Sequence, residues 1–462
     1  MRQTAAEGAN PRTGVRRVNL SGTRTAGRTH HLTVARAPCC LESQTMNVIV
    51  LGAGVIGVAS AWYLRRAGHD VTVLERNAGP ACETSFANGG QISVSHAEPW
   101  ANPSAPWKVL KWLGREDAPL LFRLRADPAQ WRWLLAFLRE CPAGRSRANM
   151  VQLLRLGTHS RQCLQALRGE LGLQYDQRTG GILHFYTDPK EFDAAIEPAR
   201  VMRELGCERR VIDRDEVLRI EPAMAAAGPR IVGATYTGED ESGDVHQFTT
   251  ALVRHAQAAG VRFRFGVRVQ ALRAEAGAVR SVEIASEDGG YETLPAEAAV
   301  VAMGVHSTAL VAPLGLRLPV YPAKGYSATL PVLDAQAAPT VSLTDDEHKL
   351  VFSRLGDRLR IAGTAELGGY GLALNRTRCD AIVRRTLDLF PGCSEARLAT
   401  FWAGLRPATP GNVPLIGPTR VRGLFLNTGH GTLGWTHACG SGQALAELVS
   451  GRRPEVDFSF LG

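Results

Sequence analysis

The sequence predicts an α/β fold built around a parallel sheet, and three neighbouring features indicate it. Residues 47–51 (NVIVL) form a continuous apolar run, which is typical of a strand buried on both faces of a sheet. A glycine-rich turn leads into an expected helix over about 55–67, closed by Gly68. A second apolar run at 71–74 (VTVL) completes a strand–helix–strand unit, and such a unit joins parallel strands.

The rest of the chain mixes helical and extended patterns, read from the spacing of its apolar residues. We expect helices within 108–205 and over 249–259, 377–390 and 440–450, and strands over 261–265, within 281–364 and over 423–427. A strand, a glycine-rich loop and a helix therefore return at the far end of the chain. This return predicts a domain assembled from separate stretches.

Length and composition place the chain among ordinary globular proteins. Its 462 residues are too many for one simple core, so roughly two or three structural units are expected. Apolar residues make up 45% of the chain and charged residues 21%, which excludes a disordered or collagen-like protein. No apolar run approaches the roughly 18 to 20 residues that a membrane-spanning helix requires.

The formal charge of +9 does not indicate a nucleic-acid partner. Residues 1–45 hold seven Arg and only two acidic residues, a net of +5, which leaves +4 for the remainder. Nucleic-acid binding needs a basic stripe on a folded surface, so no nucleic-acid partner is expected. Residues 1–45 are interpreted as a disordered extension or as sequence before a true start at Met46; an organelle transit peptide is the alternative.

The nine cysteines are scattered along the chain, their number is odd, and none forms a CxxC pair. This pattern predicts neither a disulfide framework nor a zinc site, and we expect no metal. A reducing compartment follows, so the expected location is the cytoplasm.

Residues 52–57 (GAGVIG) match the GxGxxG pattern, and their context strengthens the match. The motif follows a strand, opens a helix, and leads to Glu75 at the end of the next strand, 18 residues past Gly57. Gly52 would allow the tight turn and Gly54 the approach of a pyrophosphate, while Gly57 would allow close packing of helix and strand. The alternative is an ordinary glycine-rich turn. The full context favours a dinucleotide site in which Glu75 binds the ribose hydroxyls.

Three observations favour FAD over NAD as the dinucleotide. The motif lies at the start of the folded chain, the chain exceeds a minimal NAD dehydrogenase, and residues 83–91 form a polar loop suited to a large cofactor. Glu75 argues against NADP, because it would repel the 2′-phosphate.

Several ordered motifs then carry a resemblance to a known family. The most specific stretches are 51–64, 83–88, 320–327, 401–407 and 426–442. From Met46 almost to its end, the chain resembles the FAD-dependent D-amino acid dehydrogenases, within the larger D-amino acid oxidase and glycine oxidase superfamily. We therefore expect a Rossmann-type FAD-binding domain of discontinuous segments and an α+β substrate domain with a mixed sheet. The expected segments are 46–100, 235–310 and 395–462 for the first domain, and 101–234 and 311–394 for the second.

The resemblance implies oxidative deamination of D-amino acids, with D-alanine favoured, to 2-oxo acids and ammonia. It also implies that electrons pass to a respiratory acceptor, for which a quinone is one candidate. Two alternatives stay open: an oxygen-using amino acid, glycine or sarcosine oxidase, and a non-catalytic flavoprotein subunit.

Substrate binding calls for a carboxylate anchor, and a planar guanidinium suits bidentate binding. Arg406, in the GLRP stretch at 404–407, matches the superfamily position that clamps the substrate carboxylate; the alternative is a surface ion pair. Tyr321 and Tyr326 could bring hydroxyls to the substrate or simply pack within a strand. Lys324 could lie near the flavin or at the surface, and a packing role for His430 is as plausible as a catalytic one.

The expected cofactor contacts come from the first strand and turn, the polar loop, and the loop before the last helix. They are Val48, Ile49, Val50, Leu51, Gly52, Ala53, Gly54, Val55, Ile56, Gly57, Glu75, Arg76, Thr84, Ser85, Asn88, Gly429, Gly431, Thr432, Leu433, Gly434 and Thr436. The amides of the last loop and the helix after it could stabilise negative charge on the reduced flavin.

Five of the eight tryptophans fall within residues 100–133, alongside basic residues. Aromatic side chains with basic neighbours suit a membrane interface, where electrons could pass to a quinone at the inner face of the cell membrane. The alternative is a helical subdomain that buries its tryptophans. Exposure of Trp107 and Trp112 would support the membrane hypothesis.

Overall fold

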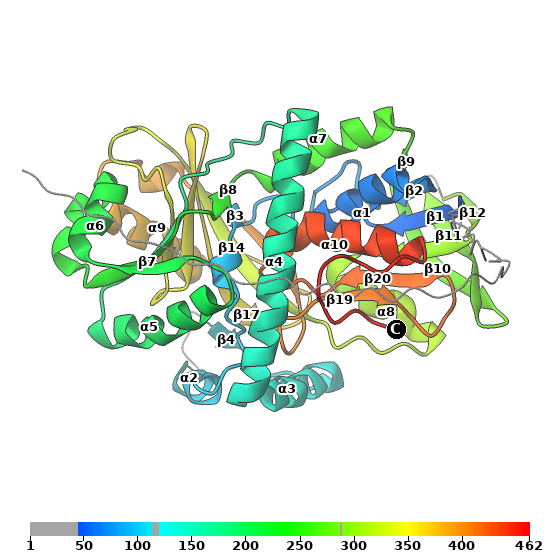
Figure 1. Cartoon of the computed structure of the whole chain (residues 1–462), viewed down its shortest axis with the longest axis horizontal. Coiled ribbons are helices and arrows are strands. Elements are labelled where there is room, and N and C mark those ends of the chain that lie inside the picture. Colours follow the sequence, from blue (N-terminus) through cyan, green and yellow to red (C-terminus); the bar gives the residue numbers. More distant parts are fainter. Residues whose placement is uncertain (1–44, 113–119, 287–288) are drawn as a thin grey trace, which may run out of the picture. The chain divides into compact units, whose positions relative to one another are not determined.

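The computed structural model describes residues 45–112, 120–286 and 289–462 (Figure 1). Its first sheet has six strands in the order β19-β20-β13-β1-β2-β9. The bounds are β1 Asn47–Leu51, β2 Asp70–Leu74, β9 Arg262–Arg264, β13 Ala298–Val301, β19 Leu415–Pro418 and β20 Leu424–Thr428. All neighbours pair in parallel except β19, which runs antiparallel to β20 at the edge.

The apolar run of β1 is continuous because the strand is covered on both faces. Val48 and Val50 pack into a core made with the helices on one face, whereas Ile49 and Leu51 pack into a second core on the other face. The helices are α1 Val55–Arg66, α4 Ala143–Leu171, α7 Val245–Ala258 and α10 Gly434–Val449. Helix α1 packs against α7 and α10, and α10 packs against the long helix α4 (Figure 1). The second core includes a three-stranded sheet of β10 Val267–Glu275, β11 Ala278–Ser286 and β12 Tyr291–Pro295.

The second large sheet has nine strands and is mixed. Eight follow the order β18-β14-β17-β16-β15-β5-β7-β6, and β4 pairs with β17. The bounds are β4 Leu120–Phe122, β5 Ile182–Tyr186, β6 Arg209–Ile212, β7 Gly233–Thr237, β14 Tyr321–Pro331, β15 Ser342–Asp345, β16 Leu350–Leu355, β17 Arg358–Leu367 and β18 Thr400–Ala408. The pairs β15–β5 and β17–β4 are parallel and the others antiparallel.

Further helices and one short strand pair complete the elements on which the site depends. Their bounds are α2 Ala105–Trp112, α3 Pro128–Glu140, α5 Pro189–Glu204, α6 Arg214–Ile220, α8 Ser307–Val311, α9 Arg376–Leu389, β3 Gln91–Ile92 and β8 Glu241–Ser242. Among the described residues, no helix combines the length and the apolarity that crossing a bilayer requires.

The predicted α/β class is confirmed, because a mainly parallel sheet carries helices and a separate mixed sheet accompanies it. The domain boundaries stay a prediction. Strand β18 lies inside the segment 395–462 expected for the FAD-binding domain, yet it pairs with β14 in the mixed sheet. Residues 1–44 of the expected extension lie outside the described residues.

The last helix begins earlier than expected, and this prediction was wrong at its start. Helix α10 starts at Gly434 rather than near 440, so Gly434 and Thr436 belong to its first turn. Two glycines inside the helix, Gly440 and Gly442, are close-packing positions. A Cβ at Gly440 would lie 2.7 Å from the Cα of Ser160 in α4, and one at Gly442 would lie 2.9 Å from Ala59 in α1.

Candidate active site

A cavity of about 1180 Å³ is lined by residues from both large sheets. The lining includes the turn after β1, the segment 81–91, strands β14, β17 and β18, and residues 427–436 at the start of α10. Pockets for small ligands usually measure about 300–1,000 Å³. This cavity therefore has room for a large cofactor together with a small substrate.

The turn between β1 and α1 requires glycine at two positions. Gly52 has a φ of +101°, and a Cβ there would lie 2.8 Å from the carbonyl oxygen of Ala302. A Cβ at Gly57 would collide with the carbonyl oxygen of Gly52. Helix α1 begins at Val55, whose amide donates to Ser85 Oγ at 3.1 Å. The amides of a first helical turn lack partners within the helix, so this end of the cavity suits an anionic phosphate group.

Glu75 directly follows β2 at the same edge of the sheet, and its carboxylate is held by three hydrogen bonds. Its Oε2 accepts from the amide of Ala53 at 2.8 Å, and its Oε1 accepts from Asn77 N at 2.9 Å and Asn77 Nδ2 at 2.7 Å. A carboxylate has about four acceptor positions, so Glu75 keeps capacity for a ribose hydroxyl in the cavity that it lines. The neighbouring Arg76 forms an ion pair with Glu83 and contacts His306 Nε2 at 3.0 Å.

Hydrogen bonds tie the cofactor loops to the mixed sheet. Thr84 Oγ1 donates to the carbonyl of Leu405 in β18 at 2.9 Å. The amide of Gly431 donates to the carbonyl of Pro407 at 2.9 Å. Thr436 Oγ1 accepts from the amide of Ser93 at 3.0 Å. The loop after β2 and the loop before α10 are thus both held to residues 405–407. The first turn of α10 is held to Ser93.

The expected cofactor residues divide into two groups. Those that line the cavity are Gly52, Gly54, Val55, Ile56, Glu75, Arg76, Thr84, Ser85, Asn88, Gly431, Thr432, Leu433, Gly434 and Thr436. Those outside the lining are Val48, Ile49, Val50 and Leu51 of β1, together with Ala53, Gly57 and Gly429. The lining group includes the N-terminal ends of two helices, α1 and α10. Two positive dipole ends, a carboxylate that keeps acceptor capacity and the large cavity fit a flavin dinucleotide.

Arg406 of β18 lines the cavity and has no carboxylate partner among the described residues. Its Nη1 donates to the carbonyl of Thr364 in β17 at 3.0 Å. Burial lowers the pKa of Arg406 to about 10, so the guanidinium remains charged at neutral pH. A partly buried cation without a counter-charge among the described residues is costly unless a ligand supplies the anion. The arrangement therefore suits the binding of a substrate carboxylate.

The two tyrosines differ in their relation to the cavity. Tyr326 lines it, but its hydroxyl donates to Glu366 Oε2 at 2.6 Å. Tyr321 lies outside the lining, buried near Trp133, and its hydroxyl donates to Asp127 at 3.2 Å. Both hydroxyls are thus engaged within the protein.

Lys324 is neither at the surface nor part of the cavity lining. It is buried in β14, where its Nζ contacts Glu366 Oε2 at 3.2 Å and donates to the carbonyl of Ala373 at 3.1 Å. Of the two alternatives for Lys324, the surface position was wrong, because Glu366 supplies a buried counter-charge that local sequence does not reveal.

His430 lines the cavity next to the start of α10, and its Nε2 is buried without a partner among the described residues. Burial, and then the neighbouring His437, hold the pKa of His430 well below its usual value. The ring is therefore neutral at physiological pH. A neutral, desolvated imidazole agrees with packing beside a cofactor and provides no protonated acid.

A buried polar network on β5 and the β15–β16 turn lines the same cavity, and the sequence analysis missed it. Asp346 Oδ2 accepts from Tyr186 Oη at 3.1 Å and lies 2.9 Å from His184 Nδ1, while Lys349 Nζ contacts Asp346 Oδ1 at 3.2 Å. Burial lowers the pKa of His184 to about 4. Burial alone would raise the pKa of Asp346, but Lys349 and His184 outweigh it and hold that pKa well below its usual value. No local pattern links residues 160 positions apart, so only the sheet brings them together.

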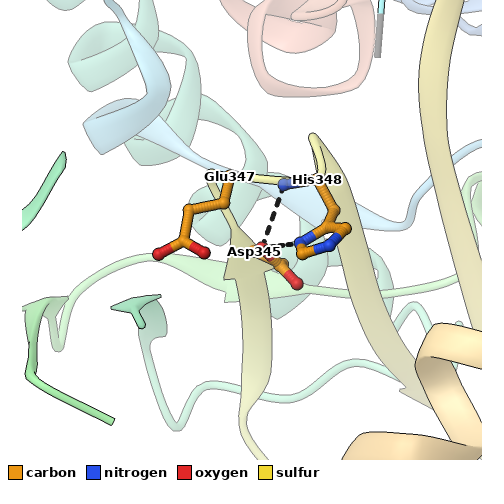
Figure 2. Close-up of side chains that lie close together, drawn as sticks. All are labelled: Asp345, Glu347 and His348. Carbon is orange, nitrogen blue, oxygen red and sulfur yellow. Dashed lines mark hydrogen bonds and ion pairs between the residues drawn. The ribbon is translucent and has the colours of Figure 1, made fainter. Parts of the chain in front are cut away.

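Within the part of the chain that the structure describes, one group has metal-ligand chemistry: Asp345, Glu347 and His348, whose ligand atoms lie within 4.8 Å of one another (Figure 2). Each member already has protein partners. Arg385 Nε donates to Asp345 Oδ2 at 2.8 Å, and His348 Nδ1 lies 3.1 Å from Asp345 Oδ1. Thr187 donates its amide and its hydroxyl to Glu347, each at 2.5 Å. We assign no metal ion to this group.

Comparison with known proteins agrees with the geometry. The DAO family, described as "FAD dependent oxidoreductase", matches residues 47–448. The chain is 60% identical over 416 residues to the D-amino acid dehydrogenase of Dechloromonas aromatica (strain RCB), which covers 90% of this chain and 100% of that protein. It is 54% identical over 418 residues to the D-amino acid dehydrogenase of Paramagnetospirillum magneticum (strain ATCC 700264 / AMB-1), with coverage of 90% and 98%.

Two solved structures illustrate the shared fold. The L-proline dehydrogenase from P. horikoshii superposes with a TM-score of 0.70 at 16% identity, covering 90% of this chain and 96% of that one. The glycine oxidase from Geobacillus kaustophilus gives a TM-score of 0.69 at 22% identity, covering 89% and 97%. The resemblance and the FAD cofactor inferred from the sequence are confirmed by the family match. The chain belongs to the DAO family of FAD-dependent oxidoreductases.

Proposed function

We propose that this chain oxidatively deaminates D-amino acids, with D-alanine favoured, to 2-oxo acids and ammonia, and passes the electrons to a respiratory acceptor. The observation that carries the proposal is Arg406, a partly buried guanidinium on the cavity wall with no carboxylate partner among the described residues. The D configuration follows from the names of the close relatives. The fold alone does not decide it, since the structural neighbours include an L-proline dehydrogenase.

In this proposal, the residues of the chain bind and orient the reactants. FAD, when bound along the two helix N-termini and Glu75, supplies the group that accepts the hydrogen and two electrons from the substrate Cα–H bond. Arg406 binds the substrate carboxylate through two parallel N–H donors. Tyr326, whose hydroxyl is held by Glu366, forms a rigid wall of the substrate site. Tyr321 takes a structural role, because it lies outside the cavity lining. No base is assigned at Cα, since hydride transfer requires only that the substrate amine be neutral.

Anaerobic flavin reduction across matched pairs of D- and L-amino acids tests this function. We expect D-alanine to bleach the flavin absorbance rapidly and L-alanine to leave it unchanged. Reduction by L-isomers alone would overturn the stereochemistry, and the absence of bleaching by any amino acid would favour a non-catalytic subunit. Air is then admitted to the reduced enzyme. Rapid peroxide formation would replace the dehydrogenase proposal with an oxygen-using oxidase.

For the electron acceptor we propose a quinone, reached at the cytoplasmic face of an anionic lipid bilayer. Support comes from an apolar surface on α2 and α3, here called the α2–α3 face and made of Trp107, Trp131, Leu135 and Leu138. The α3 members are spaced at i, i+4 and i+7, so they share one side of the helix. Trp107 is 75% exposed, as the sequence hypothesis required, while the side chain of Trp112 lies outside the described residues.

Two further observations support this acceptor. Exposed basic side chains, Lys111, Arg132 and Arg139, accompany the α2–α3 face and suit anionic headgroups. Apolar side chains from the inner side of the same helices also line the cavity, among them Val109 of α2 and Phe137 of α3. The cavity thus reaches the elements that carry the exposed apolar surface.

Co-sedimentation with vesicles tests the membrane contact. We expect the protein to bind vesicles of phosphatidylglycerol and phosphatidylcholine more strongly than vesicles of phosphatidylcholine alone. The double variant Trp131→Ser, Leu135→Ser should lose most of this binding while keeping flavin reduction by D-alanine. Leu372→Ser is the matched control, because Leu372 is as exposed as Leu135 but lies outside the α2–α3 face. Equal loss in the control, or no binding by the wild type, would refute the contact.

A further inference from the structure

Strand β17 carries a bulge beside the substrate end of the cavity. In the pairing of β14 with β17, Lys324 faces Glu366 and Tyr326 faces Gly363, with a register shift between them. Gly325 therefore stands opposite two residues, Thr364 and Ala365, where a regular ladder would place one. A bulge of this kind turns a backbone carbonyl away from the ladder and makes it available to another partner.

The bulge is held in a sterically unfavourable conformation. Thr364 has a φ of +54°, in the left-handed region that a β-branched residue rarely adopts. Its amide donates to the carbonyl of Lys349 at 3.1 Å, so the backbone is fixed from the neighbouring hairpin. Strained backbone of this type persists where the surroundings hold it, and such positions cluster at functional sites.

The guanidinium of Arg406 fits into the space that this arrangement creates. Arg406 of β18 stands opposite Ala323 of β14, and Gly404 stands opposite Gly325. A Cβ placed on Gly325 would collide with the guanidinium carbon and both terminal nitrogens of Arg406. The side chain therefore crosses β14 over Gly325 and ends at the Thr364 carbonyl, to which its Nη1 donates at 3.0 Å. Gly325, Thr364 and Arg406 all line the cavity.

We propose that Gly325 and the bulged carbonyl of Thr364 form a seat that positions the guanidinium of Arg406 for the substrate carboxylate. This inference rests on the proposed function, in which Arg406 binds that carboxylate. Gly325 acts by the absence of a side chain, and Thr364 acts through its backbone. Because one terminal nitrogen is fixed by the Thr364 carbonyl, the remaining N–H groups face a defined direction. Among the described residues, no acidic side chain pairs with this guanidinium and competes with the substrate.

The variant Gly325→Ala tests the seat directly. The three atoms nearest to the added methyl all belong to the far end of a flexible side chain, so the guanidinium can move aside and the protein should still fold. Displacement of a binding group by about 1 Å can cost on the order of 100-fold in catalysis. We expect KM for D-alanine and the Kd for propanoate, read from the flavin spectrum, to rise together by about 10- to 100-fold. Bound FAD and Tm should stay near wild type. Gly371→Ala, with open space around its added methyl, is the matched control and should change none of these quantities.

A double-mutant cycle separates this inference from the function on which it rests. In an Arg406→Leu background, Gly325→Ala should produce no further loss of propanoate binding, because the seat acts only through the guanidinium. An additive loss in the double variant would overturn the seat. If Arg406→Leu weakens propanoate binding but Gly325→Ala does not, the clamp stands and the seat is refuted. If Arg406→Leu itself leaves D-alanine turnover and propanoate binding unchanged, the carboxylate clamp fails instead.

Discussion

Replacement of Arg406 by Leu is the change that tests the site most directly. Arg406 is the cavity-lining cation whose only hydrogen bond among the described residues goes to a backbone carbonyl, that of Thr364. A second variant, Arg406→Lys, keeps a positive charge but replaces a planar two-donor fork by a single ammonium group. The pair therefore separates the loss of charge from the loss of bidentate geometry.

The magnitude follows from the bonds that the guanidinium would make. A hydrogen bond to a charged group contributes about 1.5–3 kcal/mol, so a bidentate contact accounts for about 3–6 kcal/mol. The variant Arg406→Leu should thus lower kcat/KM for D-alanine by about 100- to 10,000-fold, since about 1.4 kcal/mol corresponds to a factor of ten. We expect a smaller loss, about 10- to 100-fold, for Arg406→Lys, which keeps roughly one of the two contacts. Folding should be little affected, because no ion pair within the described residues is broken.

The assay is anaerobic stopped-flow reduction of the flavin by D-alanine, together with the FAD content and Tm of each variant. Arg397→Leu is the matched control: its side chain is exposed and pairs only with the neighbouring Glu395 among the described residues. A wild-type rate in Arg406→Leu, with FAD fully bound, would refute the carboxylate clamp. A large drop in Tm or in FAD content would show that Arg406 stabilises the fold or the cofactor site, and would contradict its assignment as the group that binds the substrate carboxylate.

Three other predictions concern the cofactor and the stability of the fold. Gly52→Ala should purify with much less FAD, because its Cβ would lie 2.8 Å from the Ala302 carbonyl oxygen. The control Gly79→Ala, whose added methyl meets open space, should retain full FAD content. Equal FAD content in both variants would show that the turn after β1 does not require glycine at position 52. Glu75→Ala should raise the FAD Kd by about 10- to 100-fold, measured by flavin fluorescence, since a charged acceptor is lost; an unchanged Kd would exclude a ribose contact. Burial lowers the pKa of His437 to about 4 from the usual 6.5, so the unfolded chain binds more protons than the folded one between these values. Stability should therefore fall by about 3 kcal/mol as pH drops from 6.5 to 4, and His437→Leu should flatten that part of the urea-denaturation profile; identical profiles would refute it.

Local sequence was sufficient for the dinucleotide end of the site. The strand at 47–51, the glycines of the turn and Glu75 all lie within about 30 residues, and each has a conformational requirement that the residue type itself reveals. Gly52 and Gly57 are needed because backbone approaches too closely for a Cβ, and a GxGxxG spacing reports this constraint directly. The α/β class and the FAD cofactor could therefore be predicted.

The last helix shows where local composition misleads. The glycines at 429, 431 and 434 suggest a loop, so the sequence predicts the last helix only from about 440. In the structure α10 begins at Gly434, and Gly440 and Gly442, which are poor helix formers, allow it to approach α4 and α1 closely. Tertiary packing outweighs the propensity, and no neighbouring residue in the sequence signals it.

The substrate end of the site depends on contacts between distant segments. The sequence motif identified Arg406 as a candidate, but its seat on Gly325 and the Thr364 carbonyl exists only because β14, β17 and β18 lie side by side. The buried partner of Lys324 and that of the Tyr326 hydroxyl were likewise decided by strand pairing, whereas the packing of α3 against β14 brings Asp127 to the Tyr321 hydroxyl.

The sequence by itself thus determined the class of fold, the cofactor, and the residue types available for substrate binding. These follow from short-range requirements: apolar periodicity, glycine where backbone is crowded, and a carboxylate at a strand end. Only the tertiary structure decided that Arg406 lies on the cavity wall without a carboxylate partner among the described residues, and in what direction its guanidinium points. The reason is physical, because desolvation, ion pairing and strand register depend on residues that are far apart in the chain and meet only after folding.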